Sequence, residues 1–231
     1  MQSFLIKSDN KNILIDACNG NDKPRSDISE WGNLKTDFLK NLDEIDLTAE
    51  DVDIVVCTHM HCDHVGWNTK LENGVWIPTF QNAKYVFVRD EYDYWKQCPE
   101  KELADDNAGF DDSISPVVEA GLAEFVGMDR KIDKNISLMP TPGHTPGHVS
   151  INIESEGRRA IISGDLLHHP CQVANTGWMA WNTFPVKALD ARKRILKEIV
   201  GKDVLLIGSH FADPVAGKVM NSESGYIFVT E

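Results

Sequence analysis

Short apolar runs, separated by polar and Gly/Pro-rich stretches, make up most of this chain. Short runs rich in Val, Ile, Leu and Phe and bounded by turn residues are typical of β-strands. The pattern predicts strands at residues 4–6, 12–16, 52–57, 84–88, 125–126, 136–139, 149–153, 159–162, 203–207 and 225–230.

Amphipathic stretches lie between these runs. They predict helices at residues 36–42, 90–97, 116–122 and 186–200, with a helix or turn from residue 65 onward. The polar, acidic segment 99–112 predicts a surface loop. Strands in two batches, each interspersed with helices, indicate a layered α/β sandwich.

Length, charge and cysteine content narrow the class of protein. At 231 residues, one domain spanning residues 1–231 is expected. The formal net charge of −13 argues against nucleic acid or an anionic membrane surface as a partner. No long apolar run and no signal-peptide pattern are seen. Five scattered cysteines without a C-x-x-C pair predict free thiols in a reducing cytoplasm.

The densest chemical signal follows the apolar run at 52–57. There, His59, His61, Asp63 and His64 fall within six residues. In extended backbone, alternate residues project to the same side, so His59 and His61 could reach one ion. If the chain then turns into a helix, Asp63 and His64 are directed to a second point nearby. This spacing suits two metals about 3.5–4 Å apart, and a chance cluster on a loop is the disfavoured alternative. Cys62 could be a further ligand, but a position facing away from the metals is favoured.

Other ligand-type residues also follow predicted strands. Asp165 follows the run at 159–162, His210 follows 203–207, and His144 lies in a Pro/Gly turn between strands. Each is a weak signal alone. Their recurrence in the same context as the histidine motif predicts a metal site assembled at one edge of the sandwich.

The order of these motifs carries a resemblance to a known family. His-x-His-x-Asp-His, then Gly143-His144, Gly164-Asp165 and Ser209-His210, resembles the metallo-β-lactamase superfamily over residues 4–230. The resemblance implies a four-layer αββα sandwich and a binuclear site, with zinc the usual metal and manganese, iron or cobalt as alternatives. It assigns His59, His61 and His144 to the first metal. It assigns Asp63, His64 and His210 to the second, with Asp165 bridging both.

Within this superfamily, residues 63–69, 76–80, 143–148 and 164–168 look like the lactonase and methyl-parathion-hydrolase-like branch. Acyl-homoserine lactonases of the superfamily carry Tyr three residues after the bridging Asp. Here that place is His168, a departure that counts against acyl-homoserine lactones as the substrate.

The expected activity is metal-dependent hydrolysis of a small ester-like substrate, with a lactone as first choice. A metal-bound hydroxide would attack the carbonyl. Asp63 could also shuttle a proton to the leaving group, and His168 could donate a hydrogen bond to the developing oxyanion. The alternative for His168 is a supporting or surface position.

The aromatic residues suggest apolar walls for a hydrophobic substrate arm, although at least half are expected to be core. They are Trp67, Trp76, Phe184, Phe211 and the stretch 175–181. A phosphotriester or thioester hydrolase with the same site is one alternative function. A non-hydrolytic metal-binding or redox module is another. The expected partner is a small molecule, with no nucleic acid and no membrane, and a homodimer is compatible with the resemblance.

Overall fold

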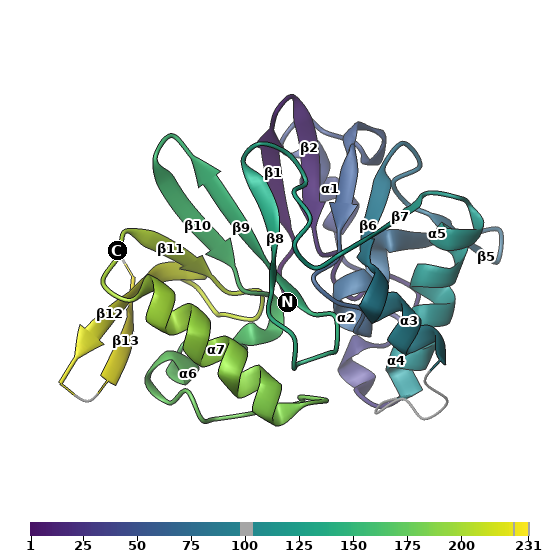
Figure 1. Cartoon of the computed structure of the whole chain (residues 1–231). Coiled ribbons are helices and arrows are strands. Elements are labelled where there is room, and N and C mark those ends of the chain that lie inside the picture. The colour runs from purple at the N-terminus through teal and green to yellow at the C-terminus, as the bar shows by residue number, and fades with distance from the viewer. Residues whose placement is uncertain (98–103, 224, 231) are drawn as a thin grey trace. The chain divides into compact units, whose positions relative to one another are not determined.

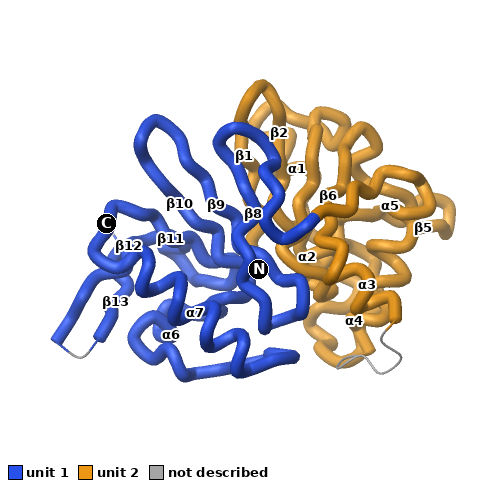
Figure 2. The backbone as a smooth tube through the Cα atoms, viewed as in Figure 1, with its two compact units in different colours: residues 1, 127–231 blue, residues 2–126 orange. Residues whose placement is uncertain are grey.

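The computed structural model describes residues 1–97, 104–223 and 225–230. The chain divides into two compact units, coloured separately in Figure 2. Residues 2–126 form the N-terminal unit, and residues 127–231, with Met1, form the C-terminal unit. Each unit contains one large sheet of its own.

The N-terminal unit is built on a five-stranded sheet in the order β1-β2-β3-β6-β7. Its strands are β1 (Phe4–Ser8), β2 (Lys11–Ile15), β3 (Ile54–Val56), β6 (Lys84–Val88) and β7 (Ala123–Val126). β1 and β2 form an antiparallel hairpin, whereas β2, β3, β6 and β7 run parallel. Asp9 and Asn10 both have positive φ at the hairpin turn, a conformation that these two residue types tolerate.

Helices and one small hairpin surround this sheet (Figure 1). They are α1 (Phe38–Asp43), α2 (Cys62–Val65), α3 (Arg89–Gln97), α4 (Ala104–Gly109), a π-helical turn (Phe110–Ile114), α5 (Ser115–Glu119) and the hairpin β4 (Thr69–Glu72)–β5 (Val75–Pro78). Trp95 of α3 is buried with Tyr85 and Phe87 of β6 and Ile114 in one hydrophobic core. This core fixes the carboxyl end of β3, where the histidine motif begins.

The C-terminal unit is built on a six-stranded sheet in the order β13-β12-β11-β10-β9-β8. Its elements are β8 (Ile136–Pro140), β9 (Val149–Ser155), β10 (Arg158–Ile162), α6 (Cys171–Ala174), α7 (Pro185–Ile199), β11 (Val204–Ile207), β12 (Ala216–Ser222) and β13 (Gly225–Val229). Among the described strands of this sheet, β10 and β11 pair in parallel and the other neighbouring pairs are antiparallel. Ile195 and Ile199 of α7 are buried in one core with Ile161 of β10 and Leu206 of β11. This apolar stripe is the one predicted for residues 186–200.

Every strand predicted from the sequence is present within a few residues. The hairpin β4–β5, the strand β12 and the short helix α6 were not predicted. β12 and α6 mix polar and apolar residues without clear periodicity, and each strand of the hairpin is only four residues long. The helical turn at the histidine motif begins at Cys62, three residues earlier than expected. None of the described helices has both the length and the apolar character needed to cross a bilayer.

The surface-loop prediction for residues 99–112 is wrong where the structure describes the segment. Residues 104–112 are helical and contain three buried carboxylates, Asp105, Asp106 and Asp112. Asp105 accepts the backbone N–H groups of Ser26, Asp27 and Ile28. Acidic composition indicated exposure, but these acids are buried with polar partners. Residues 99–103 of the predicted loop lie outside the described residues.

Candidate functional site

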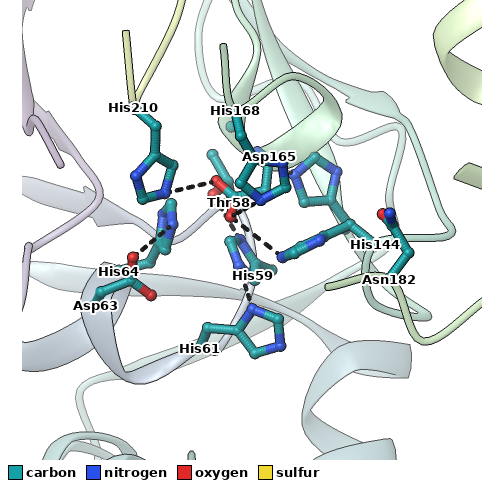
Figure 3. Close-up of polar contacts among 12 residues, drawn as sticks. Thr58, His59, His61, Asp63, His64, His144, Asp165, His168, Asn182 and His210 are labelled. Atoms are coloured by element: carbon teal, nitrogen blue, oxygen red, sulfur yellow. Dashed lines mark hydrogen bonds and ion pairs between the residues drawn. The ribbon is translucent and has the colours of Figure 1, made fainter. Parts of the chain in front are cut away.

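The N-terminal unit brings His59 and His61 together directly after β3. Their ring atoms His59 Nε2 and His61 Nδ1 are 3.0 Å apart, and the two rings meet edge to face (Figure 3). His59 Nδ1 lies 3.1 Å from the hydroxyl oxygen of Thr58, whose own proton goes to Asp16 Oδ2 at 2.9 Å. This chain of hydrogen bonds puts the ring proton of His59 on Nδ1. Its Nε2 lone pair therefore points at His61.

Asp16, at the end of β2, organises the other half of the motif. Its carboxylate accepts the backbone N–H of Thr58 at 2.7 Å and lies 2.9 Å from His64 Nδ1. The remaining ring nitrogen of His64, Nε2, lies 3.6 Å from Asp63 Oδ2. A carboxylate on one imidazole nitrogen fixes the tautomer and leaves the other nitrogen as a ligand, an arrangement common in metal sites.

Two further buried carboxylates hold the backbone of the motif. Glu91 Oε1 accepts the N–H of Met60 at 3.1 Å, and Asp106 Oδ1 accepts the N–H of Cys62 at 3.1 Å. Asp106 Oδ2 also lies 4.0 Å from His61 Nε2. Residues 58, 60 and 62 thus give their N–H groups to buried carboxylates, while the side chains at 59, 61 and 63 are the ligand candidates.

Cys62 does not fit the role of ligand. Its side chain is buried against Gly109 of α4, where an added Cβ would lie 2.9 Å from Cys62 Cβ. Burial raises the pKa of the Cys62 thiol, which disfavours the thiolate that metals bind.

The C-terminal unit gathers three imidazoles around one carboxylate. Asp165 Oδ2 lies 3.2 Å from His144 Nε2 and 3.1 Å from His168 Nε2, and Asp165 Oδ1 lies 3.3 Å from His210 Nε2 (Figure 3). Asp165 and His210 meet because β10 and β11 are parallel, so the residues that follow them emerge at the same edge of the sheet.

His144 is brought to the same place by a glycine turn. Gly143 has φ +136°, and a Cβ there would lie 2.1 Å from the backbone N of Ala188 in α7. Only glycine allows the turn to approach α7 so closely. His148 closes the turn, since its Nε2 accepts the backbone N–H of Asp165 at 2.9 Å and its Nδ1 lies 2.9 Å from Thr141 Oγ1.

Buried Arg192 and Gln172 tie the Asp165 turn to the segment that follows α6. The guanidinium of Arg192 donates to the carbonyls of Leu166, Thr176 and Trp178 at 2.6–2.9 Å. Gln172 accepts the N–H of His168 at 2.7 Å and donates to Trp178 O at 2.9 Å. The two side chains hold His168 in place through its backbone.

The residues of both clusters fit a divalent metal. Two ligands on a tetrahedral ion at the usual bond length of about 2.0–2.1 Å are roughly 3.3 Å apart. The separations of His59 from His61, and of Asp165 from His144 and His210, are 3.0–3.3 Å. His59 with His61, Asp63 with His64, and His144 with Asp165 each offer ligand atoms within 4.8 Å of one another. Imidazole and carboxylate donors suit zinc and its neighbours in the first transition row.

The aromatic wall candidates divide into core and surface. Trp67 and Phe211 are buried core residues, and Trp76 lies under the ammonium group of Lys23, 3.7 Å from the ring centre. Trp178, Trp181 and Phe184 are exposed. Only Trp181 among these three has a ring contact with a histidine of the C-terminal cluster, His168, at 6.1 Å within the described part of the chain.

Sequence reasoning missed the residues that support both clusters. They are Asp16, Glu91, Asp106, Gln172 and Arg192. Asp16 is the last residue of the strand predicted at 12–16, a place close to that of the ligand candidates, so a signal was present. Glu91 and Asp106 lay in segments predicted as a helix and a surface loop, where an acidic residue is ordinarily exposed.

A family comparison identifies the class of this chain. Residues 2–210 match the model of the metallo-β-lactamase superfamily. The chain therefore belongs to the metallo-β-lactamase superfamily. The family prediction from the sequence is confirmed, and with it the predicted α/β fold class.

Relatives of known or assigned activity share part of the sequence. An N-acyl homoserine lactonase from a Bacillus species is 25% identical over 174 residues, which are 69% of this chain and 60% of the lactonase. A probable metallo-hydrolase of Methanocaldococcus jannaschii is 29% identical over 114 residues, which are 49% of this chain and 38% of that protein. The chain thus spans about 60% or less of the length of these two relatives.

Solved structures share the fold over nearly the whole chain. A probable metal-dependent hydrolase from Staphylococcus aureus superposes with a TM-score of 0.82 at 23% identity, over 99% of this chain and 82% of that one. A dizinc quorum-quenching lactonase solved with a product superposes with a TM-score of 0.78 at 22% identity, over 99% of this chain and 78% of that one. At this identity the likeness establishes the fold alone.

Proposed function

We propose that the two clusters together hold two divalent metal ions, most simply Zn²⁺. The proposed ligands of the first ion are His59, His61 and His144, and those of the second are Asp63, His64 and His210, with Asp165 shared. The family match runs through residues 2–210 and includes all seven, which supports a single hydrolase domain. The ligand–ligand separations within each unit support the same assignment.

We infer that the protein is a metal-dependent hydrolase of a small ester-like substrate, with a lactone as first choice. The observation that carries this proposal is the carboxylate of Asp165 with three imidazole nitrogens at 3.1–3.3 Å. When bound, two divalent ions would supply an activated water at neutral pH and polarise the substrate carbonyl. The lactonase names of the relatives agree with this reaction class. The same site would also suit a phosphotriester or a thioester.

Two side chains have proposed roles beyond holding metal. The imidazole of His168 would donate a hydrogen bond to the carbonyl oxygen of the substrate as negative charge develops there. A carboxylate oxygen of Asp63 would carry a proton to the leaving alkoxide. His168 is held for its role by Gln172, which fixes its backbone, and by the neighbouring rings of His144 and His210 at 5.1 and 5.5 Å.

We also propose a cytoplasmic location and a small-molecule partner for this protein. The four cysteines for which the structure gives a state are all free thiols, which supports a reducing cytoplasm. The net charge of −13 supports a small-molecule partner over nucleic acid or an anionic membrane. A homodimer remains part of the proposal through the family resemblance alone.

Removal of metal tests the function. Protein treated with a chelator should lose hydrolysis of γ-butyrolactone, and added Zn²⁺ or Mn²⁺ should restore it. Lactone, aryl ester, phosphotriester and thioester substrates then rank the reaction classes. Iron-containing protein that hydrolyses none of the four would overturn the hydrolase proposal in favour of a metal-binding or redox module.

A further inference from the structure

The segment 176–184 of the C-terminal unit is fastened at both ends. At one end, Arg192 donates to the carbonyls of Thr176 and Trp178. At the other, the backbone N–H groups of Thr183 and Phe184 donate to the carbonyls of His144 and Gly143 at 3.0 and 2.8 Å. We call residues 176–184 the aromatic loop. Its two ends are therefore joined to the turns that carry Asp165 and His144.

Trp181 of the aromatic loop has an unfavourable backbone conformation and an exposed side chain. It is 70% exposed, and its φ of +46° lies in the left-handed region that a bulky residue rarely adopts. Such a conformation persists only where the surrounding contacts impose it, and it is found disproportionately at functional sites. A single exposed tryptophan on a protein surface needs no explanation. A tryptophan with a strained backbone, on a loop held at both ends, does need one.

Trp181 lies close to His168, the residue proposed to contact the substrate carbonyl. Its indole ring lies 6.1 Å from the imidazole of His168, at an interplanar angle of 65°. His168 Nε2 in turn lies 3.1 Å from Asp165. A substrate whose carbonyl is hydrogen-bonded to His168 would therefore lie close to the indole ring of Trp181.

We propose that Trp181 is a specificity-determining residue that packs against the apolar arm of the substrate. This inference rests on the proposed function, in which His168 faces the substrate carbonyl. The ligand class is a lactone or ester that carries an alkyl or aryl arm next to the reacting ring. An exposed indole gains from such an arm because both lose contact with water.

Two lactones with the same ring test the proposal. γ-Decalactone carries a six-carbon arm that γ-butyrolactone lacks. In Trp181→Ala, KM for γ-decalactone should rise about tenfold, the effect of taking about two methylenes out of apolar contact. KM for γ-butyrolactone and kcat for both should stay at parental values. Trp181→Phe, which keeps an aromatic face, should restore most of the preference.

Trp178→Ala is the matched control. Trp178 is 60% exposed in the same loop, but within the described residues its contacts with the Asp165 turn run through its backbone carbonyl. Its removal should leave the ratio of the two KM values near parental. Equal changes in both variants, or an unchanged ratio in Trp181→Ala, would overturn the assignment to Trp181 while leaving the hydrolase proposal intact.

A binding measurement tests the proposed contact between Trp181 and the apolar arm without requiring turnover. Titration calorimetry compares 4-hydroxydecanoate with 4-hydroxybutyrate, the ring-opened acids of the two lactones. The parent should bind the longer acid more tightly, and Trp181→Ala should lose that difference. If the parent hydrolyses neither lactone yet shows this pattern, the proposed function fails and the apolar site stands. If the acids bind equally to the parent and to the variant, the apolar site fails.

Discussion

The two ligand clusters are supported by side chains of opposite character. In the N-terminal unit, carboxylates accept backbone N–H groups, with Asp16 at Thr58, Glu91 at Met60 and Asp106 at Cys62. In the C-terminal unit, buried Arg192 donates to backbone carbonyls on either side of α6. In the histidine motif, alternate residues present ligand side chains, and the backbone N–H groups of the residues between them need acceptors. In the C-terminal unit, the ligand candidates lie on separate turns, and donors such as Arg192 join these turns through their backbone carbonyls.

This difference has an electrostatic consequence for the ligands. The carboxylates of Asp16 and Asp106 lie 2.9 and 4.0 Å from ring nitrogens of His64 and His61. A carboxylate beside an imidazole raises its basicity and strengthens it as a metal ligand. Arg192 instead donates to the carbonyl of Leu166, the residue after Asp165, and so acts on the backbone of that turn. Burial away from water raises the pKa of Asp106 to about 6, although the hydrogen bond from the Cys62 backbone N–H acts in the opposite direction.

The largest expected effect comes from removing the ligands themselves. His61→Ala and Asp165→Ala should both abolish turnover and release metal, with the fold largely retained. Asp165→Ala should cost more, because Asp165 is the proposed ligand of both ions and His61 of one. Both losses of metal affinity should exceed the 10–100-fold that is typical of residues that only orient ligands. Metal content by mass spectrometry and folding by circular dichroism measure the outcome.

Asp165→Asn serves as the control for shape, since the amide keeps the geometry and removes the charge. Its metal affinity should fall between those of the parent and Asp165→Ala. Parental metal content in His61→Ala would remove His61 from the ligand set, and with it the assignment of the motif as half of the site.

The next effect belongs to His168. His168→Ala should lower kcat by about 10²-fold, the usual loss for one donor to a developing oxyanion, and leave metal content unchanged. His168→Gln keeps a donor and should recover part of the rate. Loss of metal in His168→Ala would instead make His168 a ligand. Parental kcat with full metal content would make it a bystander.

A smaller effect is expected from the carboxylates that support the histidine motif, and it tests whether they strengthen the ligands as well as hold the backbone. Asp106→Asn should lower metal affinity by about 10–100-fold, because the charge near His61 is lost while the amide oxygen still accepts the N–H of Cys62. Glu91→Gln is the matched control, since Glu91 Oε1 accepts the N–H groups of the Met60 backbone and the Trp95 indole. Its metal affinity should stay near parental. Equal losses in both variants would show that these acids act only on the backbone.

The sequence predicted the candidate metal ligands of each cluster better than the residues that support them. His59, His61 and Asp63 are visible because such residues seldom cluster by chance, and Asp165 and His210 because they follow apolar strands. Asp106 and Arg192 are long-range partners whose burial depends on how other segments fold over them. Local composition assigns charged residues to the surface. The same reasoning explains the error at residues 104–112, where three buried acids were read as a loop.

The smallest expected effect concerns a buried cation in the N-terminal unit. Lys23 is fully buried, with its ammonium 3.1 Å from Asp112 Oδ1 and 2.8 Å from Thr69 Oγ1, and Arg25 pairs with the same carboxylate at 2.8 Å. Burial lowers the pKa of Lys23 from 10.5 to about 8, against the opposing effect of Asp112. Its counterpart Arg192 also has a lowered pKa through burial, but a guanidinium remains charged through this range.

Between pH 8 and pH 10.5, the unfolded chain therefore binds more protons at Lys23 than the folded one. The free energy of unfolding should gain a contribution from this group as the pH rises through that window. One pKa unit corresponds to about 1.4 kcal/mol, so the gain is at most a few kcal/mol. Lys23→Met should lose this gain and leave turnover unchanged, as measured by urea denaturation at pH 7, 8, 9 and 10. Lys35→Met, at an exposed lysine of the same unit, should follow the parent. A parental slope in Lys23→Met would mean that Asp112 keeps the Lys23 ammonium charged across this pH range. Each unit would then contain a buried cation that does not titrate.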